Sequence, residues 1–391
     1  MVWVILFWIA VCSLIHSYLL FPLILSILGR YARANTIAWQ PDDPLPFVSI
    51  LMAVHNEETV IIEKLRSVFQ TTYPKDRFEL LVGSDNSTDR TNDILIIYAN
   101  ENQALRYFLY SQRSGKPSVI NKLRQEARGK ILVMTDANVY FRKDTLFQLA
   151  RHFKNSRIGL VGANIVNSRK EINGISIQEW TFLSREIRIK HYEGSIWGTM
   201  IGAEGGCYAV RNELYSPVPA GFAVDDFYVT MKVIEKKFSS MLEMDAVCYE
   251  DVSNDLGEAF RRKVRISSGN FRNLREFGRM LWPPFNGLSF SLFSHKVLRW
   301  LGPFFLIIIL LSNILLWHQA GFYRATMIFQ LAILTMIILD YLLRKIRFHI
   351  VFLRFITHFY GMNLALLLGF FKYLTKAETD VWQPTRRSKA D

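Results

Sequence analysis

The 391-residue sequence predicts an α/β protein with a mostly parallel sheet, helices on both faces of that sheet, and apolar helices near both ends of the chain. Two observations support this fold class. From residue 47 onward, short apolar runs alternate with amphipathic segments, which is typical of strand–helix units. Residues 2–29 contain no Lys, Arg, Asp or Glu, and long apolar runs return after residue 297. Together they indicate a membrane protein with a soluble central domain.

The first apolar stretch, residues 2–29, exceeds the roughly 20 residues that a helix needs to cross a bilayer. It lacks the basic start of a cleavable signal peptide, so we expect a retained anchor over residues 1–29. Arg30 and Arg33 follow directly, and the positive-inside rule then places the next segment in the cytoplasm. Residues 30–46 are predicted to form a linker, because their second part, residues 37–46, is rich in proline.

The central domain is predicted to span residues 47–254 and to lie at the cytoplasmic face of a cell membrane. Strands are predicted at 47–54, 78–83, 105–110 and 130–135, with helices at 56–70, 88–98 and 117–127 between them. A helix after 144, a strand near 158–163, a helix at 176–192, a helix after 226 and a strand near 240–248 complete the domain. Strict alternation of strands and helices favours a parallel sheet that is covered on both faces.

Polar turns follow the first two strands, His55–Glu58 after one and Ser84–Thr91 after the other. Glu57 and Asp85 could bond a base or a ribose there, although helix capping explains either turn better when each is taken alone. Lys116 follows Ser-Gly and could neutralise a phosphate, but a lone Gly-Lys is more often a solvated turn. The sequence has no Walker loop and no G-x-G-x-x-G, so ATP hydrolysis and Rossmann oxidoreductase chemistry lack their fingerprints.

Asp136 and Asn138 end the apolar run 130–135 and offer oxygen ligands for a divalent cation that carries a diphosphate. An ordinary turn is the commoner meaning of this triplet alone. The glycine-rich stretch 202–211 would let the backbone approach a ligand, and a bend before a strand explains it equally well. Asp225 and Asp226 begin a predicted helix, either as charges that complement its dipole or as a general base with a raised pKa.

A basic amphipathic helix is predicted over about 255–279, within a region 255–295 that precedes the C-terminal apolar runs. Arg261 and Arg265 on this helix could bind lipid head groups or the phosphates of a leaving diphosphate, and both roles are compatible. Two to three membrane helices are expected over 296–375, with runs at 297–317 and 325–343 as clean spans. The third run, 349–374, carries Arg354, His358 and Asn363 and is a less regular span or a re-entrant segment. If all three of these C-terminal runs crossed, in addition to the N-terminal anchor, the basic tail, 376–391, would lie outside the cell, against the positive-inside rule.

The formal net charge of +13 does not require nucleic acid as a partner, because many basic residues flank apolar runs or fall in the basic helix. Membrane lipid is the partner that this pattern favours. Three cysteines give no disulfide framework and no Cys-x-x-Cys metal spacing.

Taken in order, these motifs resemble those of membrane-bound family 2 glycosyltransferases, the group that contains cellulose, hyaluronan and poly-N-acetylglucosamine synthases. The resemblance covers residues from about 44 to 280. It implies a GT-A-type domain that catalyses inverting transfer of a sugar from a nucleotide sugar, expected to be UDP-linked, to a glycan or lipid-linked acceptor. Polysaccharide synthesis for the cell surface, with partner subunits of an export system, is the expected setting.

The resemblance also assigns roles to individual residues. Val54, His55, Glu57 and Asp85 would hold the uridine, and Lys116 would lie near the nucleotide. Asp136 and Asn138 would stand at the Asp-x-Asp position that binds the diphosphate and Mg²⁺ or Mn²⁺. Glu204, Gly205 and Gly206 would line the acceptor entry, Asp226 would be the catalytic base with Asp225 before it, and Arg261 and Arg265 would bind the diphosphate from a gating helix.

Two departures from the family pattern bear on activity. Asn138 replaces the second Asp, which removes a charge from the metal position. The segment Arg262-Lys-Val-Arg265-Ile266 stands where the polymerising enzymes have Gln-x-x-Arg-Trp, and its lack of Trp argues against processive growth of a chain. Two alternatives therefore stay open: transfer of a single sugar to a lipid carrier, and a catalytically silent nucleotide-binding subunit of a polysaccharide-synthesis complex.

Overall fold

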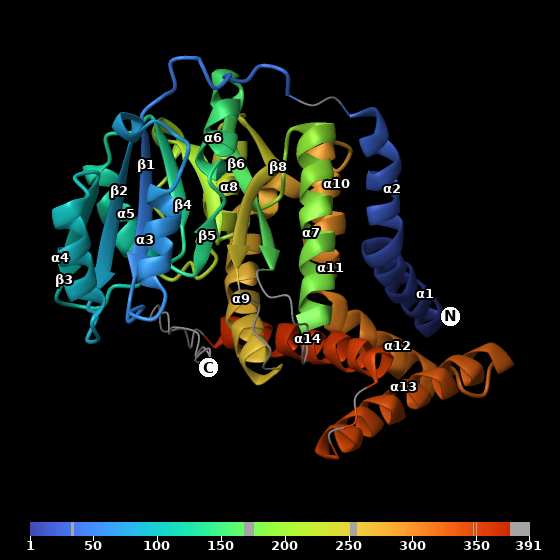
Figure 1. The fold of residues 1–391 in the computed structure, drawn as a ribbon. Helices are drawn as coiled ribbons and strands as arrows, with labels where there is room; N and C mark the ends of the chain where they lie inside the picture. Colours follow the sequence, from blue (N-terminus) through green and yellow to red (C-terminus); the bar gives the residue numbers. More distant parts are fainter. Residues whose placement is uncertain (33–34, 168–175, 251–255, 347, 349, 376–391) are drawn as a thin grey trace. The chain divides into compact units, whose positions relative to one another are not determined.

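A computed structural model describes residues 1–32, 35–167, 176–250, 256–346, 348 and 350–375. The chain forms two compact units (Figure 1). One contains the described residues of Leu28–Glu171 and Leu183–Val252, and the other contains those of Met1–Ile27, Ile172–Phe182 and Ser253–Ala377. The expected start of the basic helix at 255 and the tail 376–391 lie outside the described residues.

The first unit is built on a mixed sheet that has eight strands among the described residues, in the order β3-β2-β1-β4-β7-β6-β8-β5. The strands β1, β2, β3 and β4 are mutually parallel, whereas β7 runs antiparallel to β4 and β6, and β5 runs antiparallel to β8. Their bounds are Val48–Val54 (β1), Phe78–Asp85 (β2), Leu105–Tyr110 (β3), Ile131–Thr135 (β4), Val139–Phe141 (β5), Ile158–Asn167 (β6), Cys207–Arg211 (β7) and Ser239–Glu250 (β8).

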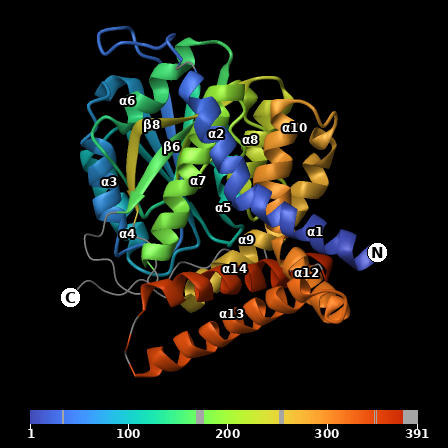
Figure 2. The same ribbon diagram turned by 90° about the vertical axis from the view of Figure 1, so that its right-hand side faces the viewer.

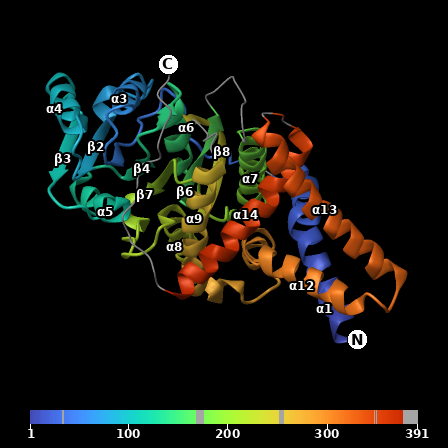
Figure 3. The same cartoon turned by 90° about the horizontal axis from the view of Figure 1, so that it is seen from below.

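Helices cover both faces of this sheet, as the alternating pattern predicts. Figures 2 and 3 show α3, α4 and α6 on one face and α5 and α8 on the other. The helices of this unit are α3 (Ile61–Phe69), α4 (Thr91–Glu101), α5 (Lys116–Glu126), α6 (Thr145–Ala150) and α8 (Asp225–Glu235), while α7 (Ser176–Trp197) has its first residues in the other unit. The central strands β1 and β4 are mostly apolar and buried at all but one position, so both faces of the sheet contribute to the core.

Strand register brings four chain segments to one edge of the sheet. Val54 pairs with Ser84 where β1 and β2 end, and Thr135 at the end of β4 pairs with Cys207 at the start of β7. The turns after β1, β2 and β4 and the loop before β7 therefore meet there. This is the edge at which open α/β sheets bind ligands. The predicted helix 56–70 begins only at Ile61, because the preceding residues form the first of these turns.

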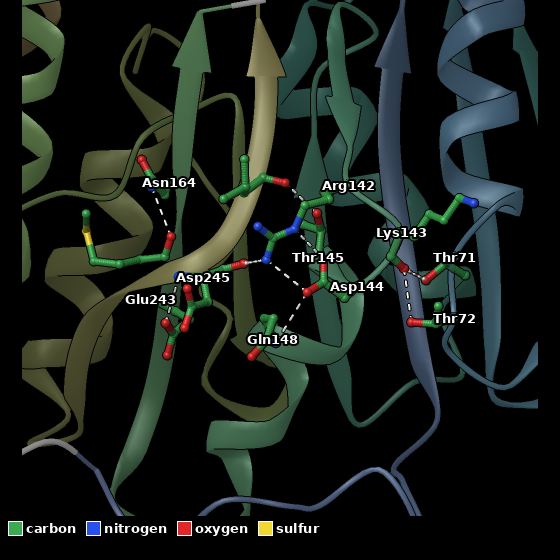
Figure 4. Close-up of polar contacts among 12 residues, drawn as sticks. Thr71, Thr72, Arg142, Lys143, Asp144, Thr145, Gln148, Asn164, Glu243 and Asp245 are labelled. Carbon is green, nitrogen blue, oxygen red and sulfur yellow. Dashed lines mark hydrogen bonds and ion pairs between the residues drawn. The ribbon is translucent and has the colours of Figure 1, made fainter.

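The segment after β5 is fixed by polar contacts at the base of α6 (Figure 4). Arg142 donates to a carboxylate oxygen of Asp144 at 2.9 Å and to the carbonyl of Asp245 at 2.6 Å. The carbonyl of Lys143 accepts hydrogen bonds from the hydroxyls of Thr71 and Thr72 at 3.1 and 3.2 Å. This segment is therefore tied both to β8 and to the chain that follows α3.

The second unit is helical in its described residues. Its longer helices are α1 (Val2–Ile15), α2 (Phe21–Leu28), α9 (Leu256–Phe277), α12 (Gly302–Leu316), α13 (Gly321–Lys345) and α14 (Val351–Leu374). Shorter pieces are the helices α10 (Gly287–Ser291) and α11 (Leu298–Trp300) and the π-helices His16–Leu20 and Leu292–Val297. In the described parts of both units, 3₁₀ turns lie at Gly29–Tyr31, Lys75–Arg77, Arg151–Lys154, Asn212–Leu214 and Gly278–Leu281.

Among the residues that the structure describes, three helical stretches are long and apolar enough to cross a membrane: Val2–Tyr31, Gly321–Lys345 and Val351–Leu374. The run at 297–317, expected as a clean span, is instead part of a bent pair, Gly287–Trp300 and Gly302–Leu316, with an angle of 61° between them. Pro303 explains the break, because proline has no amide hydrogen to donate and disfavours helical geometry in the residue before it.

The helix α14 packs along α9 at very short range. Ser267 donates to the carbonyl of Leu366 at 2.8 Å, and a Cβ atom added at Gly369 would lie 2.3 Å from that of Ser267. Farther along α14, the imidazole of His358 bonds the carboxylate of Glu179 at 2.7 Å. This contact accounts for His358, whereas Asn363 donates to the carbonyl of Phe359 within α14 itself at 2.9 Å.

Candidate functional site

The turns after β1 and β2 are held together by hydrogen bonds between them. The amide of Asn56 donates to the hydroxyl of Ser87 at 3.1 Å, and the side-chain oxygen of Asn56 accepts from the amide of Thr88 at 2.8 Å. Asn56 has a φ of 53°, a left-handed conformation that asparagine tolerates better than most residues. The Glu57 side chain is buried in this turn, and that of Val54 packs in the core. Both predicted nucleotide-binding residues therefore have buried side chains at a turn that hydrogen bonds hold in place.

The carboxylate of Asp85 binds the loop that leads into α5. It accepts hydrogen bonds from the amides of Ser114 and Gly115 at 2.8 and 2.9 Å, while its carbonyl bonds the ring of His55 at 2.9 Å. Gly115 has a φ of 81°, which explains why a glycine precedes Lys116. Asp85 therefore orients the start of α5, and any contact that it makes with a base or ribose would use the remaining lone pairs of the same carboxylate.

Lys116 connects the acid after β4 with the acids that begin α8. Its ammonium lies 2.6 Å from the Asp136 carboxylate and 3.4 Å from the carbonyl of Gly205. Burial lowers the pKa of Lys116, but the charges of Asp136, Asp225 and Asp226 outweigh burial and raise it overall. Lys116 is thus a permanent cation, and the two acidic sites that the sequence placed ninety residues apart converge on it.

The predicted metal position contains one carboxylate and one amide. The side chain of Asp136 is about one-third exposed, and the amide nitrogen of Asn138 donates to the Glu250 carboxylate at 3.2 Å. Within the described part of the chain, no group of three or more His, Cys, Asp or Glu residues could hold a metal ion. This donor set fits a hard divalent ion that takes most of its ligands from a substrate diphosphate and from water, as Mg²⁺ commonly does.

Asp226 lies in the first turn of α8, where the carboxylate accepts a hydrogen bond from the amide of Phe227 at 2.7 Å. Gly205 lies directly against it: a Cβ atom added there would be 2.8 Å from an Asp226 carboxylate oxygen. Burial and the neighbouring charge of Asp225 raise the pKa of Asp226 to about 6, against the opposing effects of Lys190 and Lys116. A carboxylate with this pKa is charged at neutral pH and basic enough to take a proton from a hydroxyl.

The loop before β7 is attached to both flanking helices. Glu204 in this loop forms an ion pair of 2.6 Å with Lys190 of α7. The amide of Ala203 donates to the hydroxyl of Thr230 at 3.0 Å, and that hydroxyl donates to the carbonyl of Asp226 at 2.7 Å. Gly206 continues the loop, and its carbonyl accepts from the amide of Asp136 at 3.1 Å. The predicted acceptor-side residues thus lie between the two acids.

Sequence reasoning missed Lys190, Thr230 and Lys64. Lys64 on α3 is fully buried. Its ammonium donates to the hydroxyl of Thr135 at 2.7 Å and to the carbonyl of Val139, the residues that precede and follow the turn 136–138. Burial lowers the pKa of Lys64 to about 8. A lysine among the apolar positions of a helix was the only available signal, and it does not identify the distant partners. Arg261 and Arg265 lie on α9 in the other unit, and their predicted role stays a prediction.

The geometry of this edge can be compared with known proteins. Residues 49–215 match the family model of glycosyl transferase family 2. The chain carries a family 2 glycosyltransferase domain. This confirms the resemblance drawn from the sequence. Among solved structures, the mannosyltransferase PcManGT from Pyrobaculum calidifontis, in complex with GDP-Man and Mn²⁺, is similar with a TM-score of 0.72 and 21% identity, covering 95% of this chain and 100% of that one. This likeness confirms the predicted GT-A-type fold.

Two curated relatives match parts of the chain. The beta-monoglucosyldiacylglycerol synthase of Trichormus variabilis is 31% identical over 153 residues, which are 39% of this chain and 32% of the relative. The poly-beta-1,6-N-acetyl-D-glucosamine synthase of Staphylococcus epidermidis is 24% identical over 252 residues, 63% of this chain and 59% of the relative. The matched part of the chain thus spans about a third to three-fifths of the length of these two relatives.

Proposed function

We propose that the protein is a membrane-embedded, inverting glycosyltransferase that moves a sugar from a nucleotide sugar, expected to be UDP-linked, to a glycan or lipid-linked acceptor at the cytoplasmic face. The observation that carries this proposal is the convergence of Asp136 and Asp226 on Lys116 and Gly205. In this proposal Asp136 holds the diphosphate and Asp226 receives the proton of the acceptor hydroxyl.

The reaction needs one displacement. The acceptor oxygen attacks the anomeric carbon of the donor sugar while the bond from that carbon to the diphosphate oxygen breaks, so the configuration at this carbon inverts. The hydroxyl proton passes to Asp226, and the electron pair of the broken bond leaves with the diphosphate. With a pKa of about 6, Asp226 holds the proton only transiently at neutral pH.

Negative charge builds on the leaving diphosphate during the reaction, and nearby cations stabilise it. Lys116 supplies a permanent positive charge at this place, since the surrounding acids keep it protonated. Asp136 and Asn138 would hold Mg²⁺ or Mn²⁺, and such an ion, when bound, offsets negative charge on the departing phosphates. Arg261 and Arg265 are proposed to add further cations from α9, in the role that the family resemblance gives them.

For the orientation in the membrane, we propose three crossings: the N-terminal helix, the bent pair ending in α12, and α13. The packing of α14 on α9 supports a position for α14 at the inner surface, because α9 carries exposed arginines that are costly to place in hydrocarbon. Three crossings leave both the catalytic domain and residues 376–391 in the cytoplasm, in agreement with the positive-inside rule. Fusion of a reporter to the C-terminus tests this; activity of a periplasmic reporter contradicts it.

Two acceptor classes fit the proposal, a growing polysaccharide and a lipid. The segment Arg262–Ile266 lacks the tryptophan of the polymerising enzymes, which favours transfer of one sugar per acceptor. Mass analysis of the product, made from purified protein and one labelled nucleotide sugar, distinguishes the two classes. A series of products that differ by one sugar supports polymerisation, and one added sugar supports single transfer.

The test of the proposal is release of nucleoside diphosphate from a panel of nucleotide sugars in nanodiscs, with Asp226→Asn as the diagnostic variant. This variant should lose at least about 100-fold in kcat, the usual scale for removing a general base, and should bind nucleotide as wild type does. Asp93→Asn, the same change on the exposed surface of α4, serves as the control. Wild-type turnover by Asp226→Asn would remove Asp226 as the base, and no release from any donor would favour a silent subunit.

A further inference from the structure

We propose that Lys190 is a positioning residue for the transfer reaction: its ion pair with Glu204 holds the loop Gly202–Gly206 beside Asp226 and keeps a cation facing that carboxylate. The inference rests on the proposed function and extends it to a residue on α7, a helix to which the family resemblance gives no role in the chemistry.

Lys190 is a buried cation with defined partners. Its side chain is 5% exposed, and its ammonium donates to the Glu204 carboxylate at 2.6 Å and to the carbonyl of Ala203 at 3.3 Å. Both partners belong to the glycine-rich loop. Because breaking a buried pair by removing one member leaves an uncompensated charge, the pair fixes the loop to α7 strongly.

The same loop contacts the proposed base from the other side. Gly205 follows Glu204 directly, and a Cβ atom at this glycine would lie 2.8 Å from an Asp226 carboxylate oxygen. Thr230 joins the amide of Ala203 to the carbonyl of Asp226 through hydrogen bonds of 3.0 and 2.7 Å. A loop released from Lys190 would therefore be free to change its position relative to the carboxylate that takes the proton.

The charged and titratable groups around Asp226 come from four elements. Asp225 lies beside it on α8, Lys190 faces it from α7, Lys116 from α5 and Tyr208 from β7. Burial and Asp225 raise the pKa of Asp226, and Lys190 opposes them more strongly than Lys116 does.

The partners of Lys190 influence how strongly it lowers the pKa of Asp226. Burial lowers the pKa of Lys190, while Glu204, Glu186 and Asp226 raise it, so the lysine stays charged. The negative charge of Glu204 also offsets part of the field that Lys190 exerts on Asp226. Removing Lys190 and removing Glu204 should therefore act on Asp226 in opposite directions.

The experiment compares Lys190→Met, Glu204→Gln and Lys190→Arg with wild type, and uses Lys75→Met on the exposed surface as the matched control. We expect the acidic limb of the pH profile of kcat/KM to shift to higher pH by about 0.5–1 unit in Lys190→Met and to lower pH by a smaller amount in Glu204→Gln. Lys190→Arg should restore the wild-type limb. A purely structural role would lower kcat without opposite displacements.

A readout without turnover gives the same information. Each variant is paired with its Asp226→Asn derivative, and the pH at which the two melting temperatures diverge reports the protonation of Asp226. If Lys190→Met does not fold, Glu204→Gln and its derivative carry the test. If the enzyme is active but neither the acidic limb of the kcat/KM profile nor the pH of divergence moves in the variants, the role of Lys190 is overturned and the proposed function stands. If wild type is inactive but the pH of divergence shifts in the variants, the proposed function is overturned and the effect of Lys190 and Glu204 on the protonation of Asp226 stands.

Discussion

Substitution of Gly205 by alanine tests the closest contact in the site. The added Cβ would lie 2.8 Å from an Asp226 carboxylate oxygen, where a carbon and an oxygen normally stay about 3.3 Å apart. The loop or the carboxylate must therefore shift by about 0.5 Å. Because a misplacement of about 1 Å can cost about 100-fold in rate, we expect kcat to fall about tenfold, or about 1.4 kcal/mol in the barrier, with little change in nucleotide affinity.

The assay is steady-state release of nucleoside diphosphate, with nucleotide affinity measured separately by calorimetry. Gly206→Ala is the neighbouring comparison, since its Cβ would meet a methyl group of Val139 at 3.0 Å instead of the carboxylate. Gly278→Ala is the neutral control, because its Cβ would enter open space. If Gly205→Ala keeps kcat within twofold of wild type, the loop does not constrain Asp226 and the reasoning fails.

Three further outcomes follow from the same contacts. In rate profiles, kcat/KM should fall about tenfold per pH unit below pH 6 as Asp226 is protonated. Folding raises the pKa of Asp226 from 3.8, so the protonated form of this side chain stabilises the folded protein fully below about pH 4, and this stabilisation is lost as the pH rises through 6. Melting scans from pH 4 to 8 should detect the loss. Asn138→Asp replaces an amide that donates to Glu250 at 3.2 Å by a second carboxylate, so we expect about 1 kcal/mol of lost stability that Mn²⁺ restores; a melting temperature indifferent to Mn²⁺ would contradict this. Gly369→Ala inserts a methyl 2.3 Å from the Cβ of Ser267, and thermal unfolding should show at least about 2 kcal/mol of destabilisation, whereas wild-type stability would mean that α9 and α14 separate easily.

The sheet and its functional edge could be predicted because their signals are local. Apolar runs of strand length, each followed by a polar turn, identify a parallel strand and its carboxyl end without any knowledge of distant contacts. Asp136 and Asp85 were recognisable for this reason. The short strand β5 was not, because three residues directly after a polar turn give no periodicity to read.

The supporting residues could not be predicted because their partners are remote in the chain. Thr230 contacts a loop 27 residues away, and Lys64 bonds a residue 71 positions later. Each is an ordinary residue of an amphipathic helix until the fold supplies its partner. The bend at Leu301 is the opposite case: Pro303 is visible in the sequence, but the length and hydropathy of the run concealed its effect.

The hydrogen bonds between Asn56 and the pair Ser87 and Thr88 have an evolutionary consequence. The turns after β1 and β2, whose bonded residues are 31 and 32 positions apart, behave as a single rigid part, since neither turn can change its backbone without breaking bonds to the other. Such a preorganised surface loses little entropy when a ligand settles on it. A change in which ligand the protein prefers would therefore require matched substitutions in both turns. Exchange of one turn alone between homologous domains should yield an inactive hybrid.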